Sequence, residues 1–196
     1  MILILMGISG IGKTTIGKLL ATRTGWTFED GDDYHPEANR RKMAAGIPLN
    51  DDDRGPWLAT VHERLMQYFK EGKSVIFACS ALKVKYREQL AEGFSENDFR
   101  FVYLHASTAL VRERIEARDH AYMNPKLLDS QVETLEEPSA AWAVSVAGTP
   151  EQSVDEILAR LRKAGKLATG GRRNEHSTAS TSGLKASNAT GRTERS

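Results

Sequence analysis

A glycine-rich segment near the amino end of the chain has the pattern of a phosphate-binding loop. It matches the motif GxxxxGK[ST] at every fixed position and reads Gly7-Ile8-Ser9-Gly10-Ile11-Gly12-Lys13-Thr14. The glycines let the backbone curl so that consecutive amide N–H groups point at a phosphate. Lys13 is expected to bridge the β- and γ-phosphates of ATP, and Thr14 to offer its hydroxyl to Mg²⁺. We therefore predict a nucleotide site formed by this loop and Thr15.

Acidic residues follow the second predicted strand, residues 26–29, in the run Asp30-Gly31-Asp32-Asp33. If the strand is extended, Asp30 and Asp32 share one face at its carboxyl end, beside the phosphate loop. Phosphoryl transfer needs Mg²⁺ held by oxygen ligands and an oriented acceptor hydroxyl. We predict that Asp30 lies in the Mg²⁺ shell through water and that Asp32 accepts the hydroxyl proton. The alternative is an exposed acidic turn before a proline, to which we assign Asp33.

The stretch that follows is dense in charged and amide side chains and is interrupted by glycine and proline. Such a mixture suits a hydroxylated, anionic substrate, because carboxylates and amides bind hydroxyls while Lys or Arg binds the acid. A solvated loop has the same composition, so spacing alone leaves both interpretations open. The residues concerned are His35, Asn39, Lys42, Asp51, Asp52, Asp53 and Arg54.

Short apolar runs alternate with helical patterns along the chain, which is typical of a mostly parallel sheet with helices on both faces. The predicted strands cover residues 2–6, 26–29, 74–79 and 99–104, with a fifth near 143–146. The predicted helices cover residues 13–23, 62–69 and 108–117, and a last one begins at the capping box 149–152. We predict an α/β fold that binds its ligands at the carboxyl ends of the strands.

Composition indicates one globular domain, which we place at residues 1–164. Hydrophobic residues make up 40% and charged residues 27% of the 196, which is ordinary for a soluble domain. The single cysteine, Cys79, excludes an internal disulfide, and no apolar run reaches the roughly 20 residues of a membrane helix. We expect a cytoplasmic protein with no membrane partner.

Residues 165–196 are of low complexity, and we predict that this tail is disordered and has no role in chemistry. Residues 160–196 carry nine Lys or Arg against two acids, which raises the hypothesis of nucleic-acid binding. The charges are scattered, however, and the segment has no aromatic side chain on which a base could stack. We therefore favour a solvated basic extension and expect no nucleic-acid partner.

The phosphate-loop motif alone is shared by kinases, GTPases and motor ATPases. The chain has no Asn-Lys-x-Asp motif for reading guanine, and its third predicted strand ends in Cys79-Ser80 rather than in an acid. It is also too short for the extra elements of a force-generating ATPase. These three observations favour a compact small-molecule kinase.

Three further segments lie in the same order as in one known family. The first runs from Gly31 to Leu58 and contains Asp32, His35-Pro36, Asn39, Lys42-Met43, Asp53-Arg54 and Pro56-Trp57. The others read Cys79-Ser80-Ala81-Leu82-Lys83-x-x-Tyr86-Arg87 and Leu127-Leu128-x-Ser130-Gln131-x-x-Thr134-Leu135-Glu136-x-Pro138. With the phosphate loop, they resemble the gluconate kinase (gluconokinase) family of P-loop kinases over residues 2 to about 164.

The resemblance implies transfer of the ATP γ-phosphoryl group to the 6-hydroxyl of D-gluconate, in a cytoplasmic enzyme that is often a homodimer. It implies that Lys13 and Thr14 serve ATP and Mg²⁺, and that Asp32 positions or deprotonates the 6-hydroxyl. It also implies a set of residues that line the gluconate site, with Lys42 or Arg54 facing the carboxylate. That set is His35, Asn39, Lys42, Arg54 and Gln131.

Related small kinases close an arginine-bearing lid over the phosphates, and we expect a small lid at about residues 118–127. Arg114 and Arg118 are spaced i, i+4 at a helix end and can face one way. We assign Arg118 to catalysis and Arg114 to nucleotide binding, where they would stabilise transition-state charge. The chain departs from the family pattern here, because His120-Ala121 stands where Gly-His is usual, so His120 is given no catalytic role.

Two alternatives remain open. A kinase of the shikimate, adenylyl-sulfate or nucleotide type would share the phosphate loop and an acid after the second strand, but it lacks the long block from His35-Pro36 to Pro56-Trp57. A non-catalytic ATP-binding regulator would have the same fold, but degenerate sites usually lose one of the groups that are intact here. Those groups are Lys13, Thr14, Asp32 and Arg54.

Overall fold

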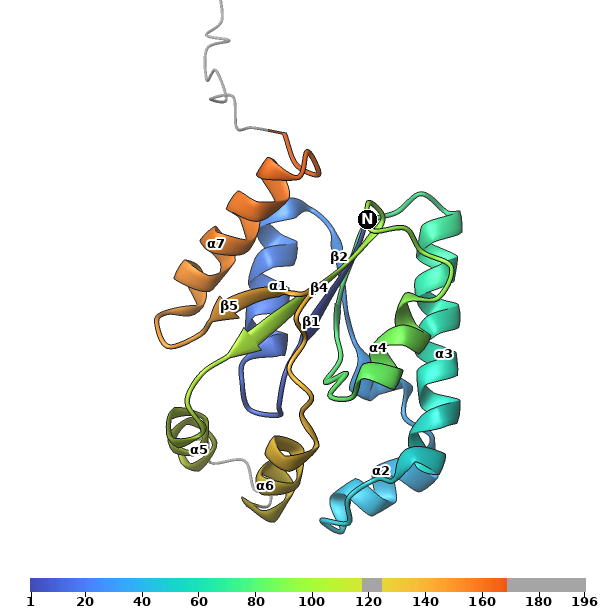
Figure 1. The fold of residues 1–196 in the computed structure, drawn as a ribbon, viewed down its shortest axis with the longest axis vertical. Helices are drawn as coiled ribbons and strands as arrows, with labels where there is room; N and C mark the ends of the chain where they lie inside the picture. Colours follow the sequence, from blue (N-terminus) through green and yellow to red (C-terminus); the bar gives the residue numbers. More distant parts are fainter. Residues whose placement is uncertain (118–124, 169–196) are drawn as a thin grey trace, which may run out of the picture.

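A single parallel sheet organises the protein (Figure 1). The computed structural model describes residues 1–117 and 125–168. The strand order is β2-β3-β1-β4-β5, and all four neighbouring pairs run parallel. The strands are β1 (Ile2–Met6), β2 (Thr27–Asp30), β3 (Val75–Ala78), β4 (Phe99–His105) and β5 (Trp142–Ser145). The predicted α/β class and parallel sheet are confirmed.

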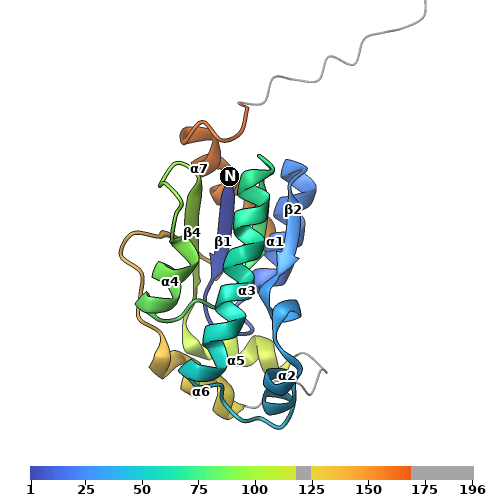
Figure 2. The same ribbon diagram turned by 90° about the vertical axis from the view of Figure 1, so that its right-hand side faces the viewer.

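Helices cover both faces of the sheet. Helices α1 and α7 pack on one face, and α3 and α4 pack on the other, as the two views in Figures 1 and 2 show. The helices are α1 (Lys13–Thr24), α2 (Glu37–Ala44), α3 (Asp51–Lys70), α4 (Val84–Ala91), α5 (Thr108–Glu116), α6 (Pro125–Thr134) and α7 (Pro150–Lys163). A short 3₁₀ turn, η1 (Gly31–Tyr34), follows β2.

The position of β1 at the centre of the sheet explains why its sequence is a continuous apolar run. All five of its side chains are buried, because the sheet is covered on both sides. Leu3 and Leu5 belong to the core on the α1 and α7 side, whereas Ile2, Ile4 and Met6 belong to the core on the α3 and α4 side. Alternation along one strand thus supplies two cores.

The polar stretch between residues 35 and 54 is mostly helical rather than a loop. It forms α2 and the first turn of α3, and the helix that we predicted over residues 62–69 is only the last part of α3. Asn50 and Asp53 form a capping box at the start of α3, and Trp57 and Leu58 are buried one turn later. Capping and burial therefore outweigh the helix-breaking effect of Gly55-Pro56.

Other element boundaries differ by small amounts. Strand β2 lies one residue later than predicted, and β5 one residue earlier than the predicted range 143–146. Helices α4 and α6 were not predicted, because both are short and carry mixed polar surfaces. No helix in the described ranges is both long and apolar enough to cross a membrane.

Some predictions concern residues that the structure does not describe. Arg118, His120 and Ala121 lie outside the described residues, as does most of the predicted lid at 118–127, whose last three residues begin α6. Most of the tail at 165–196 is also outside them. The lid, its catalytic arginine and the domain boundary at residue 164 therefore stay predictions.

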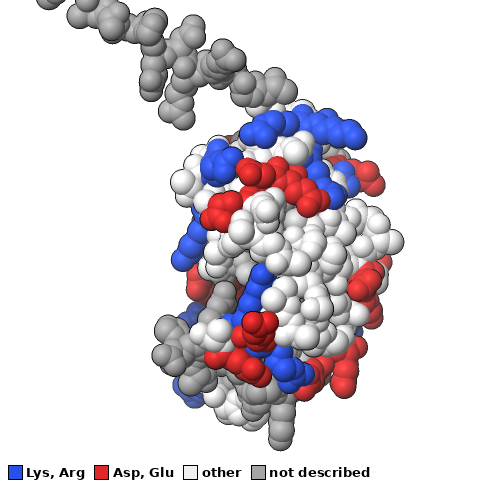
Figure 3. All heavy atoms as spheres, turned by 90° about the vertical axis from the view of Figure 1, so that its left-hand side faces the viewer, with Lys and Arg blue, Asp and Glu red and all other residues white. Residues whose placement is uncertain are grey.

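Charged side chains of both signs are mixed on the face that carries α5 and α7 (Figure 3). They gather toward the two ends of the molecule in this view, with a broad uncharged area between them. This mixture agrees with the near-neutral formal charge of +1.

Candidate active site

The phosphate loop, residues 7–14, joins the carboxyl end of β1 to the start of α1. Gly7, Gly10 and Gly12 have φ angles of 137°, 80° and 108°, in the region that favours glycine. A Cβ atom on Gly7 would lie 2.6 Å from the Leu104 carbonyl oxygen, so a side chain there would also collide with β4. The first turn of α1 contains no acid, which leaves its N–H groups available to an anion.

Lys13 lies folded back over this loop. Its Nζ donates hydrogen bonds to the carbonyl oxygens of Gly7 at 3.0 Å and Ile8 at 3.1 Å. Burial lowers the pKa of the Lys13 ammonium from its ordinary value, while the nearby Asp32 and Asp30 act in the opposite direction. The ammonium is therefore held at the loop and can exchange carbonyl oxygens for phosphate oxygens.

Thr14 and Asp30, the two residues predicted to serve Mg²⁺, are hydrogen-bonded to each other. The Thr14 hydroxyl donates to Asp30 Oδ2 at 2.8 Å, and Asp30 Oδ1 accepts from the Asp32 amide at 3.2 Å. A hydroxyl beside a carboxylate is an oxygen donor set that fits Mg²⁺. No three His, Cys, Asp or Glu side chains of the described residues come together as a metal site, so phosphate and water would supply the other ligands.

Asp32 reaches the mouth of the loop by a route that the strand pattern did not predict. Strand β2 ends at Asp30, and Asp32 lies in the η1 turn, so the predicted two-residue alternation does not extend to it. Desolvation within this concave region raises the pKa of the Asp32 carboxyl, as do Asp30 and Asp33, while Lys13 lowers it. The side chain is nevertheless 78% exposed, so it is open to an incoming acceptor.

His35 and Asn39 form a buried wall beside Asp32. The His35 ring stacks on Trp57 at 4.2 Å between centroids, and its Nε2 lies 3.9 Å from Asp32 Oδ1. Burial, with Arg54 and Arg40 nearby, lowers the pKa of His35 to about 4, so the ring is neutral at pH 7. The Asn39 amide contacts His35 Nδ1 at 3.3 Å and donates to the Asp53 carbonyl at 2.8 Å. Asn39 therefore holds this wall together.

The two cations of the predicted substrate site differ in their partners. Lys42 pairs with Asp53 at 2.5 Å between Nζ and Oδ1. Arg54 donates to the Leu49 carbonyl and lies 5.7 Å from the centroid of the Tyr86 ring. Among the described residues, no carboxylate forms an ion pair with Arg54. Arg54 therefore keeps most of its donors for a ligand, whereas the charge of Lys42 is already compensated.

Gln131 contacts the phosphate loop. Its Oε1 accepts from the Ser9 amide at 2.7 Å, and its Nε2 donates to Ser9 Oγ at 3.1 Å. The side chain is partly buried and comes from α6. The structure thus brings Gln131 to the phosphate loop, and its hydrogen bonds go there rather than to His35 or Asn39.

A hollow of about 330 Å³ opens beside the loop. Arg114 lines it together with Gly12 and Thr15, and its Nη2 lies 3.4 Å from the Gly148 carbonyl oxygen. Its lining also includes Val146 and Gly148, which follow β5, and Pro150, which begins α7, and none of them was predicted as a site residue. The small residues after the fifth strand, at the ligand-binding edge, are the signal that could have indicated them.

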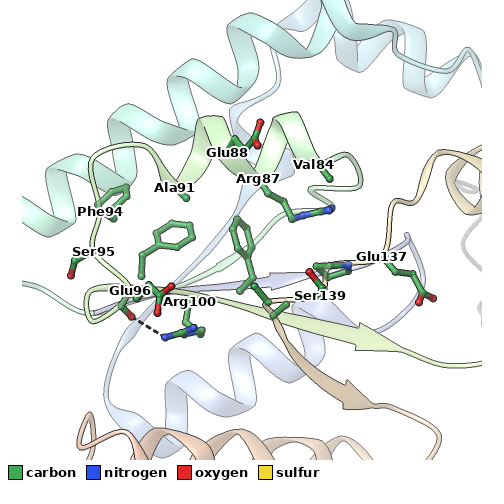
Figure 4. A pocket seen from close by; sticks show the side chains of 15 residues that line it. Val84, Arg87, Glu88, Ala91, Phe94, Ser95, Glu96, Arg100, Glu137 and Ser139 are labelled. Carbon is green, nitrogen blue, oxygen red and sulfur yellow. Dashed lines mark hydrogen bonds between the residues drawn. The ribbon is translucent and has the colours of Figure 1, made fainter.

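Another hollow, of about 380 Å³, lies away from this site (Figure 4). It is bounded by α4, the first residues of β4 and the segment 137–141, and it is mainly apolar, with Phe94, Phe99 and Phe101 in its lining. It contains no residue of the phosphate loop, of η1 or of α2. We therefore place the chemistry at the phosphate loop.

Comparisons with known proteins agree with this geometry. A family model described as an AAA domain matches residues 2–138. A gluconokinase of Gluconobacter oxydans is 46% identical over 159 residues, covering 81% of this chain and 88% of the relative. A probable gluconokinase of Xenopus tropicalis is 46% identical over 153 residues, covering 71% and 80%.

A solved structure gives the same result. The crystal structure of a gluconokinase from Sinorhizobium meliloti superimposes with a TM-score of 0.74 at 42% identity, covering 82% of this chain and 91% of that one. The chain belongs to the gluconokinase family.

Proposed function

We propose that this protein transfers the γ-phosphoryl group of ATP to the 6-hydroxyl of D-gluconate, giving 6-phospho-D-gluconate and ADP. The observation that carries the proposal is the meeting of Lys13, the Thr14–Asp30 pair and the open Asp32 carboxylate at one mouth of the phosphate loop. An ATP-dependent sugar-acid kinase needs these groups in this arrangement, because the transfer depends on positioning and charge stabilisation.

The nucleotide would be bound by the loop amides, Lys13 and the hollow beside Arg114. Thr14 would bind Mg²⁺ directly and Asp30 through water. When bound, Mg²⁺ neutralises part of the charge that develops on the phosphate oxygens. Lys13 would stabilise the same charge from the loop side, and Arg118 remains our proposed second cation for it.

Asp32 would orient the 6-hydroxyl and accept its proton as the new bond to phosphorus forms. Desolvation raises the pKa of this carboxyl, and the nearby Lys13 opposes that rise and favours the ionised form. The neutral His35 ring and Trp57 form an apolar and aromatic surface next to it. Asp32 is therefore the charged group that we place at the reacting hydroxyl.

Arg54 is our choice for the gluconate carboxylate. A guanidinium binds a carboxylate with two parallel hydrogen bonds. Among the described residues, the Arg54 guanidinium donates one hydrogen bond, to the Leu49 carbonyl, so its other N–H groups can bind the substrate. Lys42 is less suited to bind the gluconate carboxylate, since it already forms an ion pair with Asp53. We propose that Lys42 and Asp53 hold the start of α3 and bind hydroxyls of the sugar acid.

An ADP-release assay across a panel of acceptors tests the proposal. Gluconate should give Mg²⁺-dependent ADP release, and shikimate, adenylyl sulfate and nucleoside monophosphates should give none above the ATPase background. Release with one of those acceptors alone would replace the proposal with the matching kinase. ATP binding by calorimetry without release for any acceptor would favour the non-catalytic regulator.

Two further features are proposed on the family resemblance. We propose that the enzyme acts in the cytoplasm and as a homodimer. Sedimentation equilibrium of the full chain should give twice the mass of 21.7 kDa, and a monomer at micromolar concentration would contradict the homodimer.

A further inference from the structure

Gln131 and Ser9 are joined by two hydrogen bonds although they are 122 positions apart in the chain. One bond is donated by the Ser9 backbone amide at 2.7 Å, and the other by the Gln131 side-chain amide to Ser9 Oγ at 3.1 Å. Two such bonds between one side chain and one residue fix both distance and orientation. We call this pair of bonds the Ser9–Gln131 bridge.

The bridge contacts a part of the phosphate loop whose local sequence allows several backbone conformations. Ser9 lies between Gly7 and Gly10, which both have positive φ angles and are permissive in the unfolded chain. In the described residues, the Ser9 amide has Gln131 as its hydrogen-bond acceptor, and the neighbouring loop bonds run from Gly7 to Ser80 and from Ile11 to Ile8. Gln131 therefore supplies the restraint that the loop backbone lacks.

Helix α6 is held firmly enough to provide such a restraint. Leu128 lies one turn before Gln131 and is 1% exposed within the core on the α1 and α7 side. After the helix, the Glu136 amide donates to the Leu82 carbonyl, and the Glu136 carboxylate accepts from the Val84 amide. Both ends of the segment that carries Gln131 are thus attached to the body of the protein.

We propose that Gln131 is a positioning residue for nucleotide binding, which acts through Ser9 to hold the phosphate loop in its phosphate-binding form before ATP arrives. This inference deepens the proposed function and rests on its nucleotide part. It assigns Gln131 to the phosphate loop, whereas the family resemblance placed Gln131 in the gluconate site. Preorganisation of this kind lowers the ordering cost of binding and so improves affinity for ATP.

The test uses the full chain and calorimetry with ATP in the absence of gluconate. Gln131→Met keeps the length of the side chain but removes both bonds, and it should weaken ATP binding by up to roughly thirtyfold, the factor that corresponds to two hydrogen bonds of about 1 kcal/mol each. In steady-state kinetics the KM for ATP should rise while the KM for gluconate stays within about twofold. Glu133→Gln, at an exposed position on the same helix, is the matched control and should change neither.

A double-mutant cycle separates the bridge from a general loss of structure. Ser9→Ala should weaken ATP binding by itself but add little to Gln131→Met, because the two residues act as one unit. Gln131→Glu provides a second variant that should fold. Its carboxylate can still accept from the Ser9 amide and hydroxyl, but its charge should weaken ATP binding in a salt-dependent manner.

The opposite kinetic pattern would overturn the inference. If Gln131→Met leaves ATP affinity unchanged and raises the KM for gluconate, Gln131 belongs to the acceptor site. Additive effects of Ser9→Ala and Gln131→Met would likewise contradict a shared bridge. The calorimetry does not depend on the acceptor, so it decides the role of Gln131 even if gluconate gives no ADP release and the proposed function fails.

Discussion

At the scale of single residues, side chains of the same charge that look equivalent in the sequence differ in the charged partners that they contact. Lys42 and Arg54 are both cations of the same polar stretch, but only Lys42 has a carboxylate partner in the described structure. Asp32 and Asp33 are neighbours in one turn, but we place only Asp32 at the reacting hydroxyl, where desolvation raises the pKa of its carboxyl and Lys13 opposes that rise.

Replacing Arg54 should abolish selection for a carboxylate. Arg54→Met should raise the KM for gluconate about tenfold to a hundredfold, because it removes charge-assisted hydrogen bonds. Lys42→Met is the matched control and should have a smaller effect. Kinetics with gluconate and with glucitol, which lacks the carboxylate, provide the measurement. A preference for gluconate that survives in Arg54→Met but not in Lys42→Met would reverse the assignment.

Replacing Asp32 should affect turnover and spare nucleotide binding. Asp32→Asn keeps the size of the side chain but cannot take the hydroxyl proton, so kcat should fall about a hundredfold or more. ATP affinity by calorimetry should change by less than about threefold. Asp33→Asn, one residue further along the exposed turn, should keep nearly normal turnover. Near-normal kcat in Asp32→Asn would remove its proposed role.

His35 should make the protein less stable in mild acid. Its pKa is about 4 in the folded protein against an ordinary value of 6.5, so the unfolded chain binds more protons between these values. The free energy of unfolding should therefore fall as pH falls from about 6.5 to about 4, by about 3 kcal/mol in total. Urea titrations at several pH values measure this slope.

His35→Phe is the comparison for that slope. It keeps a flat ring against Trp57 but cannot titrate, so its stability should depend less on pH across the same window. An identical pH dependence in the two proteins would show that other groups cause the acid effect.

At the scale of elements, two capped helix starts support the two halves of the site. Asn50 and Asp53 cap α3, which carries Arg54, and Thr149 and Gln152 cap α7, next to the hollow beside Arg114. Asp51 adds a link from α3 to α4, since Lys83 and Lys85 donate to its carboxylate at 3.0 and 2.6 Å. These local devices determine where the long-range contacts can form.

Removing either cap should lower the stability by a similar amount but weaken the binding of different substrates. Asn50→Ala and Thr149→Ala should each lower the free energy of unfolding by about 1 kcal/mol. The KM for gluconate should rise mainly in Asn50→Ala, and the KM for ATP mainly in Thr149→Ala. Urea unfolding and steady-state kinetics check both parts. Equal changes in both KM values in either variant would contradict this division.

At the scale of the whole molecule, the acceptor side depends on how β2 is tied to α3. Glu29, next to Asp30, forms an ion pair with Arg64 at 2.6 Å and also accepts from Tyr34 and Tyr68. The pKa of Glu29 is lowered because hydrogen bonds from Arg64 and the two tyrosines outweigh its desolvation. Trp57 adds a bond to the Gly31 carbonyl at 2.7 Å. These contacts place the turn of Asp32 against α3.

Removing only the Arg64 charge of the Glu29–Arg64 ion pair should destabilise the protein more than removing the charges of both residues. Arg64→Met leaves a largely buried carboxylate without its cation and should cost about 2 kcal/mol of stability. Adding Glu29→Gln should recover part of that loss, because the uncompensated charge is gone. Urea unfolding of the two single variants and the double variant gives the coupling. Purely additive losses would show that the ion pair does not act as a unit.

The sequence by itself determined the features that depend on neighbouring residues. The phosphate loop, its lysine and threonine, and the buried strands follow from glycine conformation and apolar runs, which are local properties. The resemblance of three longer segments to the gluconokinase family identified gluconate as the expected phosphoryl acceptor. Helix α2 and the first turn of α3 were not predicted, because Gly55-Pro56 and the dense charge resemble a loop until the burial of Trp57 is known.

Only the tertiary structure decided which polar side chains remain available. The Lys42 ammonium pairs with Asp53, the Asn39 amide contacts both His35 and the Asp53 carbonyl, and Gln131 bonds to Ser9 across 122 positions of the chain. Hydrogen-bond capacity is limited, so a contact made across the fold removes a group from the substrate site. Residue types and spacing record that capacity, whereas the packing of α2, α3 and α6 around the loop determines how it is used.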